Sequence, residues 1–465
     1  MSAPLIWIFI PTVFAVMIWI IPNERLVAWL GIGISLILAL AAWLLPIETP
    51  LNLGNWSIKI TTTLTILGRH LNLSSTDQPL LIFFYSSLCF WYICSRIAGA
   101  SHKHIPYGLL IITLLISALA VEPFLYAALL IEIAVMVSIP LLKSAKHPPG
   151  RGLMRYLTFQ TMAMPFILFS GWLLTGVTAG SGELSLISQA AIFLGLGFVF
   201  LLAIFPFNTW MPLLATETHP MALAFILWIL PTVGFLFGLY FLDNFTWIRE
   251  ANNLSVILRA SGLLMIVTGG IWAAFQKNLQ RMMAYAIIME TGYSLIALSI
   301  KGTIGVDIFF GLLIPRTFAL FLWALALSII LDKNSSAQFA TVKGMGRIYP
   351  FAASIIILSH FSMAGLPLLA GFPIHQALWE QLGILSINGA ILYLVATIGL
   401  LMGGIRTLAV LVTITNEDGF SIKENWLQRF SLSLGILLLI IMGIFPQWAA
   451  PLLSQLPSMF NHLGK

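Results

Sequence analysis

The stretch GFVFLLAIFPFNTWMP, residues Gly197 to Pro212, joins an apolar run to a break that a plain membrane-crossing helix would not contain. Eight apolar residues, Phe198 to Phe205, lead directly into Pro206. Asn208 and a second proline, Pro212, follow shortly after it. Proline removes a backbone donor, and in a bilayer the freed backbone groups must be satisfied by neighbouring helices or by water in a cavity. We therefore predict a broken helix that lines the protein interior.

The composition around this stretch excludes a water-soluble protein. The chain has 465 residues, of which 60% are hydrophobic and 8% are charged, and its mean hydropathy is +1.00. A soluble domain cannot cover that much apolar surface with a polar shell. The formal net charge of +6 does not indicate a nucleic-acid partner, because the basic residues stand between apolar runs and not on one face. The composition predicts an integral membrane protein surrounded by the lipid bilayer.

Cofactor chemistry is not indicated anywhere in the chain. The two cysteines, Cys89 and Cys94, lie in one apolar run, which excludes a disulfide scaffold and a cysteine-ligated cluster. No glycine-rich fingerprint for NADH or flavin follows a strand pattern. We expect no catalytic residues, no cofactor and no metal site. The early segment PLIWIFIPTVFAVMIWIIP lacks a basic start and is long enough to span a bilayer, so we predict a membrane helix there and not a cleavable signal peptide.

Apolar runs separated by charges and prolines predict an all-α polytopic membrane protein with about fourteen transmembrane helices. The segment 47–79 is the weakest, since it has room for an interfacial helix but not for a clear crossing. The predicted spans lie near 4–22, 26–46, 80–97, 105–121, 123–142, 153–177, 187–207, 220–242, 253–275, 282–300, 305–331, 350–370, 383–413 and 428–448.

The distribution of basic residues predicts the orientation of these spans. Fifteen of the 22 lysines and arginines fall in alternate connections, beginning with the one after the first span, and six fall on the opposite side. The remaining one, Arg316, lies within a span. Cytoplasmic connections carry the excess of basic residues. We therefore expect both termini on the non-cytoplasmic side, in a bacterial inner membrane or a thylakoid membrane.

Ionisable residues inside predicted spans are the candidate site residues, because a charge at bilayer depth is costly. Each also has a structural interpretation: a satisfied buried carboxyl, a packed neutral histidine, or a counter-ion in the case of the arginine. Glu217 and His219 lie near a membrane face and are weaker candidates. The proton-path candidates are Glu132, Glu290, Arg316, His360 and His375.

A second proline break, in AGLPLLAGFP around Pro367, matches the one at Pro206. The two breaks fall in the seventh and twelfth predicted spans. Interrupted segments at matching positions of two halves are typical of inverted repeats. We predict that the fourth to eighth spans, about 105–242, repeat as the ninth to thirteenth, about 253–413, within a core of residues 80–445. Residues 1–79 then form N-terminal helices with a connecting loop, and 446–465 a short tail.

Three motifs resemble one known family. They are QKNLQRMMAYAIIMETGY (Gln276–Tyr293), GMGRIYPFAASIIILSHFSMAGLPLLAGFPIH (Gly344–His375) and FPFNTWMP. They are similar to the antiporter-like membrane subunits of proton-pumping NAD(P)H:quinone oxidoreductase, of the chain L, M and N type and most like chain M, which are shared with Mrp-type sodium/proton antiporters. The resemblance covers about Leu80 to Phe445. It implies fourteen helices with two inverted five-helix repeats, other membrane subunits as partners, and protons or sodium ions as the transported species.

The resemblance also shows where this sequence departs from the family, whose proton path is a row of lysines, histidines and a glutamate. The glutamate corresponds to Glu132, but the lysine of the broken seventh helix corresponds to Leu201 and that of the eighth to Thr232. Other positions of the row fall as follows: the gating histidine at Asn208, the histidine and lysine of the eleventh helix near Leu313 and Thr317 with Arg316 adjacent, and the lysine of the twelfth helix at His375.

Three functions remain open. The first is a divergent subunit of a larger assembly (an Mrp-type antiporter, a quinone oxidoreductase, or a related bicarbonate-accumulating or hydrogenase complex) with a degenerate proton path and a structural role. The second is an active proton-translocating subunit in which Glu132, Glu290 and His375 relay protons with water. The third is a stand-alone secondary transporter. Only about 17 residues follow the last predicted span, so we do not expect the family's long lateral C-terminal helix.

Overall fold

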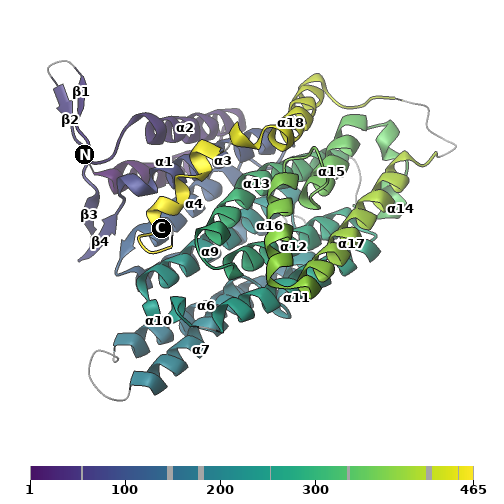
Figure 1. The fold of residues 1–465 in the computed structure, drawn as a ribbon. Coiled ribbons are helices and arrows are strands. Elements are labelled where there is room, and N and C mark those ends of the chain that lie inside the picture. The colour runs from purple at the N-terminus through teal and green to yellow at the C-terminus, as the bar shows by residue number, and fades with distance from the viewer. Residues whose placement is uncertain are drawn as a thin grey trace.

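The computed structural model describes residues 2–53, 56–66, 68–143, 150–175, 183–251, 253–331, 336–414, 421–448 and 450–463, and within them it is a bundle of membrane-length helices (Figure 1). Ten helices are long and apolar enough to cross a membrane and four shorter apolar helices join them, and each coincides with one of the fourteen predicted spans. They are α1 (Ile10–Ile20, preceded by a π-helical turn at Leu5–Phe9), α2 (Glu24–Leu44), α3 (Gln78–Ile97), α4 (His104–Ala120), α5 (Ala127–Leu142), α6 (Arg151–Thr175), α7 (Glu183–Leu201), α9 (Pro220–Asn244), α11 (Leu254–Phe275), α12 (Leu279–Ser299), α13 (Thr303–Leu331), α15 (Pro350–Met363), α17 (Ile387–Val412) and α18 (Trp426–Ile444).

Local sequence explains where several helices begin. The side chain of Asn23 accepts hydrogen bonds from the backbone N–H groups of Arg25 and Leu26 at the start of α2. Asn278 does the same for Gln280 and Arg281 at the start of α12. Such N-cap side chains satisfy donors that the first helical turn leaves free. The caps therefore fix the helix ends at the membrane faces, where polar residues interrupt the apolar runs.

Both predicted helix breaks are confirmed. After α7 ends at Leu201, the chain passes Pro206 and a short 3-10 turn before α8 (Trp210–Ala215) completes the crossing. After α15 ends at Met363, the chain passes Pro367 before α16 (Phe372–Leu385) begins. Neither proline lies within a helix. Two interrupted spans therefore place non-helical backbone at mid-bundle depth, which membrane proteins tolerate only inside protein or beside a water-filled cavity.

The helices of the two halves have matching packing partners. In the first half α4 packs on α5 and α9, and α6 packs on α7 and α8. In the second half α11 packs on α12 and α17, and α13 packs on α15 and α16. Each broken span thus lies against the third helix of its own half. This correspondence is what two inverted five-helix repeats would produce.

Helices α9, α12 and α13 form the centre of the bundle. Between 89% and 94% of their most apolar windows are buried, compared with 17% for α18 and 28% for α11. A helix that is apolar all round belongs inside a bundle, whereas one with an exposed apolar face meets lipid or another protein. Polar side chains near the middle of these three helices, such as Thr232, Glu290 and Arg316, are therefore surrounded by protein.

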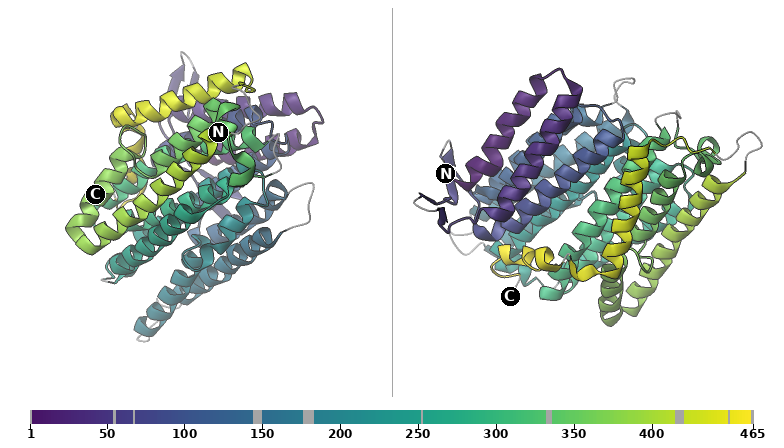
Figure 2. Two further views of the ribbon diagram at one scale, coloured as in Figure 1. Left: turned by 90° about the vertical axis from the view of Figure 1, so that its right-hand side faces the viewer. Right: turned by 90° about the horizontal axis from the view of Figure 1, so that it is seen from above.

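Both termini lie at the same face of the bundle, as Figure 2 also shows. The 3-10 turn Ser75–Asp77 before α3 contacts the 3-10 turn Leu456–Met459 near the C-terminus. The backbone N–H groups of Asn461 and His462 donate to the carboxylate of Asp243 at the end of α9. An even number of crossings requires this arrangement. Three basic residues used to predict the orientation, Lys146, Lys333 and Lys465, lie outside the described residues.

The segment 47–79 contains β-strands, so the interfacial helix considered there is wrong. β1 (Leu51–Leu53) pairs antiparallel with β2 (Trp56–Ile58), and β3 (Thr63–Ile66) with β4 (Arg69–Asn72), which also pairs with β5 (Val121–Glu122). The run ITTTLTIL is rich in β-branched residues, which favour strands over helices. Three further short helices complete the fold: α10 (Thr246–Arg249), α14 (Phe339–Val342) and α19 (Ala450–Leu453).

Candidate functional site

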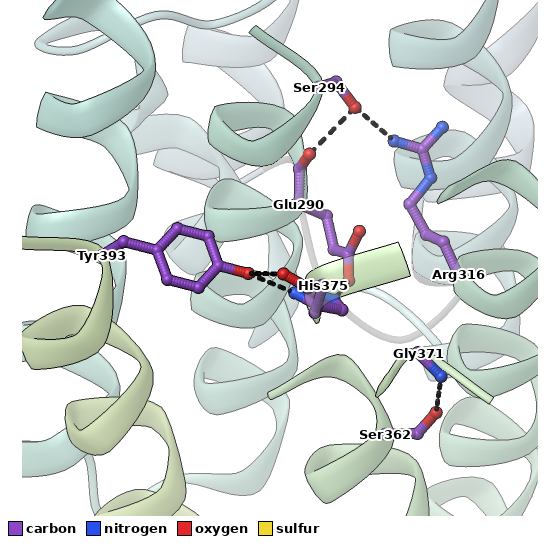
Figure 3. A network of polar contacts seen from close by, with 7 residues as sticks. All are labelled: Glu290, Ser294, Arg316, Ser362, Gly371, His375 and Tyr393. Carbon is purple, nitrogen blue, oxygen red and sulfur yellow. Dashed lines mark hydrogen bonds and ion pairs between the residues drawn. The ribbon is translucent and has the colours of Figure 1, made fainter. Parts of the chain in front are cut away.

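The central polar contact of the second half joins His375, Glu290 and Tyr393 (Figure 3). His375 Nε2 lies 3.7 Å from Glu290 Oε1, and the two side chains are 5% and 3% exposed. His375 Nδ1 lies 2.7 Å from the Tyr393 hydroxyl. The imidazole therefore has a carboxylate on one nitrogen and a phenol on the other. This is the arrangement in which a histidine can take a proton on one side and give one up on the other.

Arg316 extends the same group of residues toward the first half. Its Nη2 donates to the hydroxyl of Thr232 at 2.9 Å, and its Nη1 lies 3.4 Å from the hydroxyl of Ser294. Ser294 in turn donates to the backbone carbonyl of Glu290 at 3.0 Å. The guanidinium and the Glu290 carboxylate are near neighbours that interact electrostatically, but the hydrogen bonds recorded for the guanidinium go to hydroxyl groups. Arg316 thus places a fixed positive charge beside the carboxylate and reaches across to α9.

These contacts form a line across the bundle at mid-helix depth. Tyr393 stands on α17, His375 on α16, Glu290 on α12, Arg316 on α13 and Thr232 on α9. Glu290, Arg316 and His375 also line one cavity of about 10 Å³, close to the lower limit for holding a single water molecule. Glu290 Oε2 has no hydrogen-bond partner among the described residues. The line is therefore lateral, running between helices and not from one face to the other.

The second helix break positions His375. Gly365 has a φ of +71°, and a Cβ on it would lie 2.8 Å from the Cβ of His375. A Cβ on Gly371 would lie 2.0 Å from the carbonyl oxygen of Ser362. The backbone N–H of Gly371 donates to the Ser362 hydroxyl at 3.2 Å, which satisfies one group freed by the break. Because glycine has no side chain, Gly365 and Gly371 let the non-helical backbone between α15 and α16 fold tightly enough to bring His375 to α12.

His360 is buried apart from this site. Its Nε2 lies 2.7 Å from the carbonyl oxygen of Leu400, and its ring lies 4.8 Å from the Trp323 ring. Its Nδ1 has no hydrogen-bond partner in the described part of the chain. Nε2 is thus hydrogen-bonded to a backbone carbonyl, and Nδ1 is buried among packed side chains. These contacts match the packed-histidine interpretation, and His360 as a proton carrier stays a prediction without a neighbouring carboxylate to support it.

Among its described residues, the first half shows no comparable line of contacts around Glu132. Glu132 on α5 is partly exposed; its carboxyl contacts the Thr161 hydroxyl on α6, and its Oε2 lacks a partner among the described residues. At the break, the carbonyl oxygen of Leu201 accepts a hydrogen bond from Gln160 at 3.2 Å. Asn208 is buried, with its amide nitrogen 3.7 Å from the sulfur of Met265. The structure therefore keeps Glu132 separate from Glu290 and His375, and its role as a site residue remains a prediction.

The two weaker candidates have structural positions. Glu217 accepts hydrogen bonds from the backbone N–H groups of Gly152 and Leu153, at 2.8 and 3.0 Å, and so caps the start of α6. His219 accepts from Met221 N at the start of α9. Glu424, before α18, caps α15 in the same way through Ala352 N at 2.8 Å, and burial raises the pKa of its carboxyl. A carboxylate at a helix N-terminus compensates free backbone donors.

Three residues of the site were not among the predicted candidates. Tyr393 and Ser294 have ordinary polar side chains, and nothing in their local sequence indicates that they face a histidine or an arginine. Thr232 was recognised only as a position where the family has a lysine, yet it receives the guanidinium of Arg316. Partners that are 18 to 84 residues apart depend on helix packing, which periodicity within one helix cannot specify.

Comparison with known proteins agrees with this architecture. The family model of the NADH:quinone oxidoreductase/Mrp antiporter transmembrane region matches residues 154–402, just over half of the chain. The NADH-quinone oxidoreductase subunit N 2 of Hydrogenobaculum sp. is 25% identical over 306 residues, covering 63% of this chain and 65% of that relative. The match thus spans somewhat less than two thirds of the relative's length. This relative is a subunit N, whereas the sequence motifs are most like chain M.

Solved structures share the fold. A chain of the Mrp complex from Dietzia sp. superposes with a TM-score of 0.81 at 13% identity, over 99% of this chain and 97% of that one. A chain of the membrane-bound sulfane sulfur reductase, an archaeal respiratory membrane complex, gives 0.78 at 17% identity, over 97% and 95%. At these identities the likeness establishes the fold only. Together with the family match, it shows that this chain is an integral membrane protein that belongs to the NADH:quinone oxidoreductase/Mrp antiporter transmembrane family.

Proposed function

We propose that this chain is an antiporter-like subunit of a multisubunit ion-translocating membrane complex, an NAD(P)H:quinone oxidoreductase or an Mrp-type cation/proton antiporter, and that its proton exchange is confined to the second half. The observation that carries the proposal is His375 between Glu290 and Tyr393, at 3.7 and 2.7 Å, inside the bundle. A relay needs groups that both accept and release protons and that lie in contact or one water apart.

The second half meets that requirement with its own residues. Glu290 and His375 are both titratable, and an unperturbed histidine exchanges protons near neutral pH more readily than a lysine does. The small cavity between them adjoins the partnerless Glu290 Oε2. A proton on Nε2 of His375 can pass to the carboxylate, while Tyr393 holds the other nitrogen. Arg316 keeps its own proton near neutral pH and places a positive charge beside the carboxylate.

The first half has no titratable side chain at the two positions where the family has its lysines, Leu201 and Thr232. Leu201, at the position of the family's lysine in the broken helix, is buried and apolar. The Thr232 hydroxyl already accepts from Arg316 and donates to the carbonyl of Trp228. Without a lysine, Glu132 has no partner whose charge it could modulate. We therefore assign the first half a structural role and the second half a proton-exchanging role. The proposal combines the first two functions that the sequence left open, the structural subunit and the proton-translocating subunit.

The proposed partners are other membrane subunits and lipid. Large apolar side chains on the outer helices support this, since Trp19, Trp29 and Trp426 are 60%, 61% and 76% exposed in the isolated chain. We also propose that the face carrying both termini is non-cytoplasmic, because fifteen of the 22 basic residues fall in the connections predicted for the opposite side. The proposed location is a bacterial inner membrane or a thylakoid membrane, and which of the two it is depends on the host complex.

The experiment compares His375→Ala with Leu201→Ala in the assembled complex, reconstituted in vesicles with a pH-sensitive dye and a sodium indicator. We expect His375→Ala to lower proton flux while the complex still assembles, because the carboxylate loses its exchange partner. Leu201→Ala serves as the matched control and should leave flux unchanged. If His375→Ala assembles normally and both proton and sodium fluxes stay at the wild-type level, the subunit is structural and the proposed relay is wrong.

A further inference from the structure

An apolar groove runs along the half of the bundle nearer the terminal face, between α7, α9, α10, α11 and α12. Its volume is about 430 Å³, within the range of small-molecule sites. Along α9 its wall extends from Gly234 to Leu242, which is roughly 12 Å at 1.5 Å per helical residue. One leaflet of a bilayer core is about 15 Å thick. The groove is therefore about as deep as one leaflet, and its inner end reaches Leu202 and Ile204 beside the first helix break.

The groove is open to the membrane and lined by small residues. Ile257, on its wall, is 59% exposed, so the groove communicates laterally with the surroundings of the bundle. Gly195, Gly234 and Gly238 line it on α7 and α9. A Cβ built on Gly195 meets nothing within 4 Å. A Cβ on Gly234 or Gly238 would instead meet the side chain of Leu202 at 2.9 Å or of Phe198 at 3.3 Å. The open space is therefore the space beside Gly195, and it is available to an extended hydrocarbon chain.

A polar mouth adjoins the groove at the membrane surface. A second cavity of about 430 Å³ shares Leu242, Leu254 and Leu258 with the groove and is lined by Arg249 and Lys301. Arg249 Nη1 donates to the carbonyls at the end of α9, at 3.0 and 3.3 Å, which fixes the guanidinium at this level. Glu250 is the acidic residue in the lining, so the two cations leave a net positive mouth.

The position of these residues suits a membrane interface. Trp247 lines the outer end of the groove, and tryptophan is enriched at the level of lipid headgroups. Six basic residues fall on the predicted side of the termini, and two of them, Arg249 and Lys301, stand at this one mouth. Clustered cations directly above an apolar groove complement a negative headgroup on hydrocarbon chains.

We propose that this groove is a binding site for one anionic glycerophospholipid of the leaflet at the terminal face. Its phosphate lies between Arg249 and Lys301, and one acyl chain fills the groove as far as Leu202 and Ile204. The lipid packs behind the broken helix and completes the apolar environment of the first half. The proposal is independent of proton exchange, because neither the groove nor its mouth is lined by Glu290, Arg316 or His375, and because it is tested by counting lipids.

The first test fills the groove. Gly195→Trp adds a bulky side chain at a groove position where a Cβ meets nothing within 4 Å. Gly33→Trp is the matched control, since a Cβ on Gly33 in α2 also meets nothing within 4 Å. Native mass spectrometry of the assembled complex, extracted from its own membrane in mild detergent, counts retained phospholipids. We expect one fewer phospholipid for Gly195→Trp and no change for Gly33→Trp. An equal count for wild type and Gly195→Trp overturns the proposal.

The second test removes the headgroup contacts and does not depend on tolerance of a bulky residue. The double variant Arg249→Gln/Lys301→Gln is compared with Lys59→Gln, an exposed cation of the same face. Each complex is equilibrated in nanodiscs with equal amounts of phosphatidylglycerol, phosphatidylethanolamine and phosphatidylcholine before the lipids are counted. We expect wild type and Lys59→Gln to retain phosphatidylglycerol several-fold over the other two, and the double variant to lose that preference. Retention of phosphatidylethanolamine equal to phosphatidylglycerol by wild type, or an unchanged preference in the double variant, overturns it.

Discussion

The two halves of the molecule contain the same kind of broken helix but surround it with different side chains. At the second break, His375 meets Glu290 at 3.7 Å and Tyr393 at 2.7 Å. At the first break, Leu201 offers a backbone carbonyl to Gln160, and Asn208 lies against the sulfur of Met265. The backbone interruption is therefore not itself a sign of ion exchange. It is an architectural feature that becomes chemically active only where titratable groups face it.

Arg316 connects the two halves of the molecule, and its contacts show how the two halves differ. It stands on α13 of the second half and donates to Thr232 on α9 of the first, where the family has a lysine. A positive charge is thus present near that position, but on a group that does not release its proton near neutral pH. The arrangement supplies the positive charge of a lysine without its proton exchange, so we expect the proposed exchange path to end at this residue.

Replacing Arg316 with methionine should have the largest effect. The change removes charge-assisted hydrogen bonds to Thr232 and Ser294 and leaves the buried Glu290 without its neighbouring cation. Hydrogen bonds to charged groups contribute about 1.5–3 kcal/mol each, so we expect the free energy of unfolding to fall by several kcal/mol. Thermal unfolding of the assembled complex measures the loss. Thr232→Val, which removes one of the bonds, should cost clearly less but still measurably. If Thr232→Val unfolds like wild type, Arg316 does not join the halves.

Gly371→Ala should have the next largest effect, and only on the second break. Its new Cβ would lie 2.0 Å from the carbonyl oxygen of Ser362, so the backbone beside His375 must shift. Overpacking of this kind costs about 1–3 kcal/mol. The unfolding temperature and the yield of assembled complex report the effect. Gly195→Ala, where a Cβ meets open space, is the control and should unfold like wild type. Equal unfolding temperatures and yields of the two variants would show that the backbone around the second break is packed less tightly than described.

Tyr393→Phe should have a moderate effect, mainly on function. The variant keeps the ring that packs 5.1 Å from the Tyr293 ring but loses the hydroxyl at His375 Nδ1. A single neutral hydrogen bond contributes about 1 kcal/mol, corresponding to a change in flux of less than about tenfold. Proton flux in vesicles containing the assembled complex tests this. Tyr85→Phe, a buried tyrosine on α3 distant from the site along the chain, is the comparison. A complete loss of flux would mean that Tyr393 itself carries the proton.

Ala203→Gly should have the smallest effect. Ala203 has a φ of +50°, a left-handed conformation that glycine adopts more easily, at the first break. The gain is opposed by the loss of a buried methyl group and by the greater freedom of glycine in the unfolded chain. We expect a net change within about 1 kcal/mol and unchanged proton flux. A measurable loss of flux in this variant would show that the first break takes part in transport after all.

The sequence predicted the helices well and the site only in part. All fourteen spans, the breaks at Pro206 and Pro367, and the candidates Glu290, Arg316 and His375 follow from hydropathy, proline and buried charge. The strands near residues 51–72 were not predicted, because a hydropathy argument asks only whether a segment crosses the membrane. Tyr393 and Ser294 were not predicted either. Their roles arise from contacts between helices, and neither residue is unusual within its own helix.

The most direct measurement compares Glu290→Gln with Glu132→Gln, the same isosteric change in each half of the molecule. Proton flux is recorded for both assembled complexes in the same vesicles. If exchange is confined to the second half, Glu290→Gln lowers flux by at least about tenfold, whereas Glu132→Gln stays near wild type. A large loss with Glu132→Gln, or unchanged flux with Glu290→Gln in a complex that assembles normally, would contradict the account.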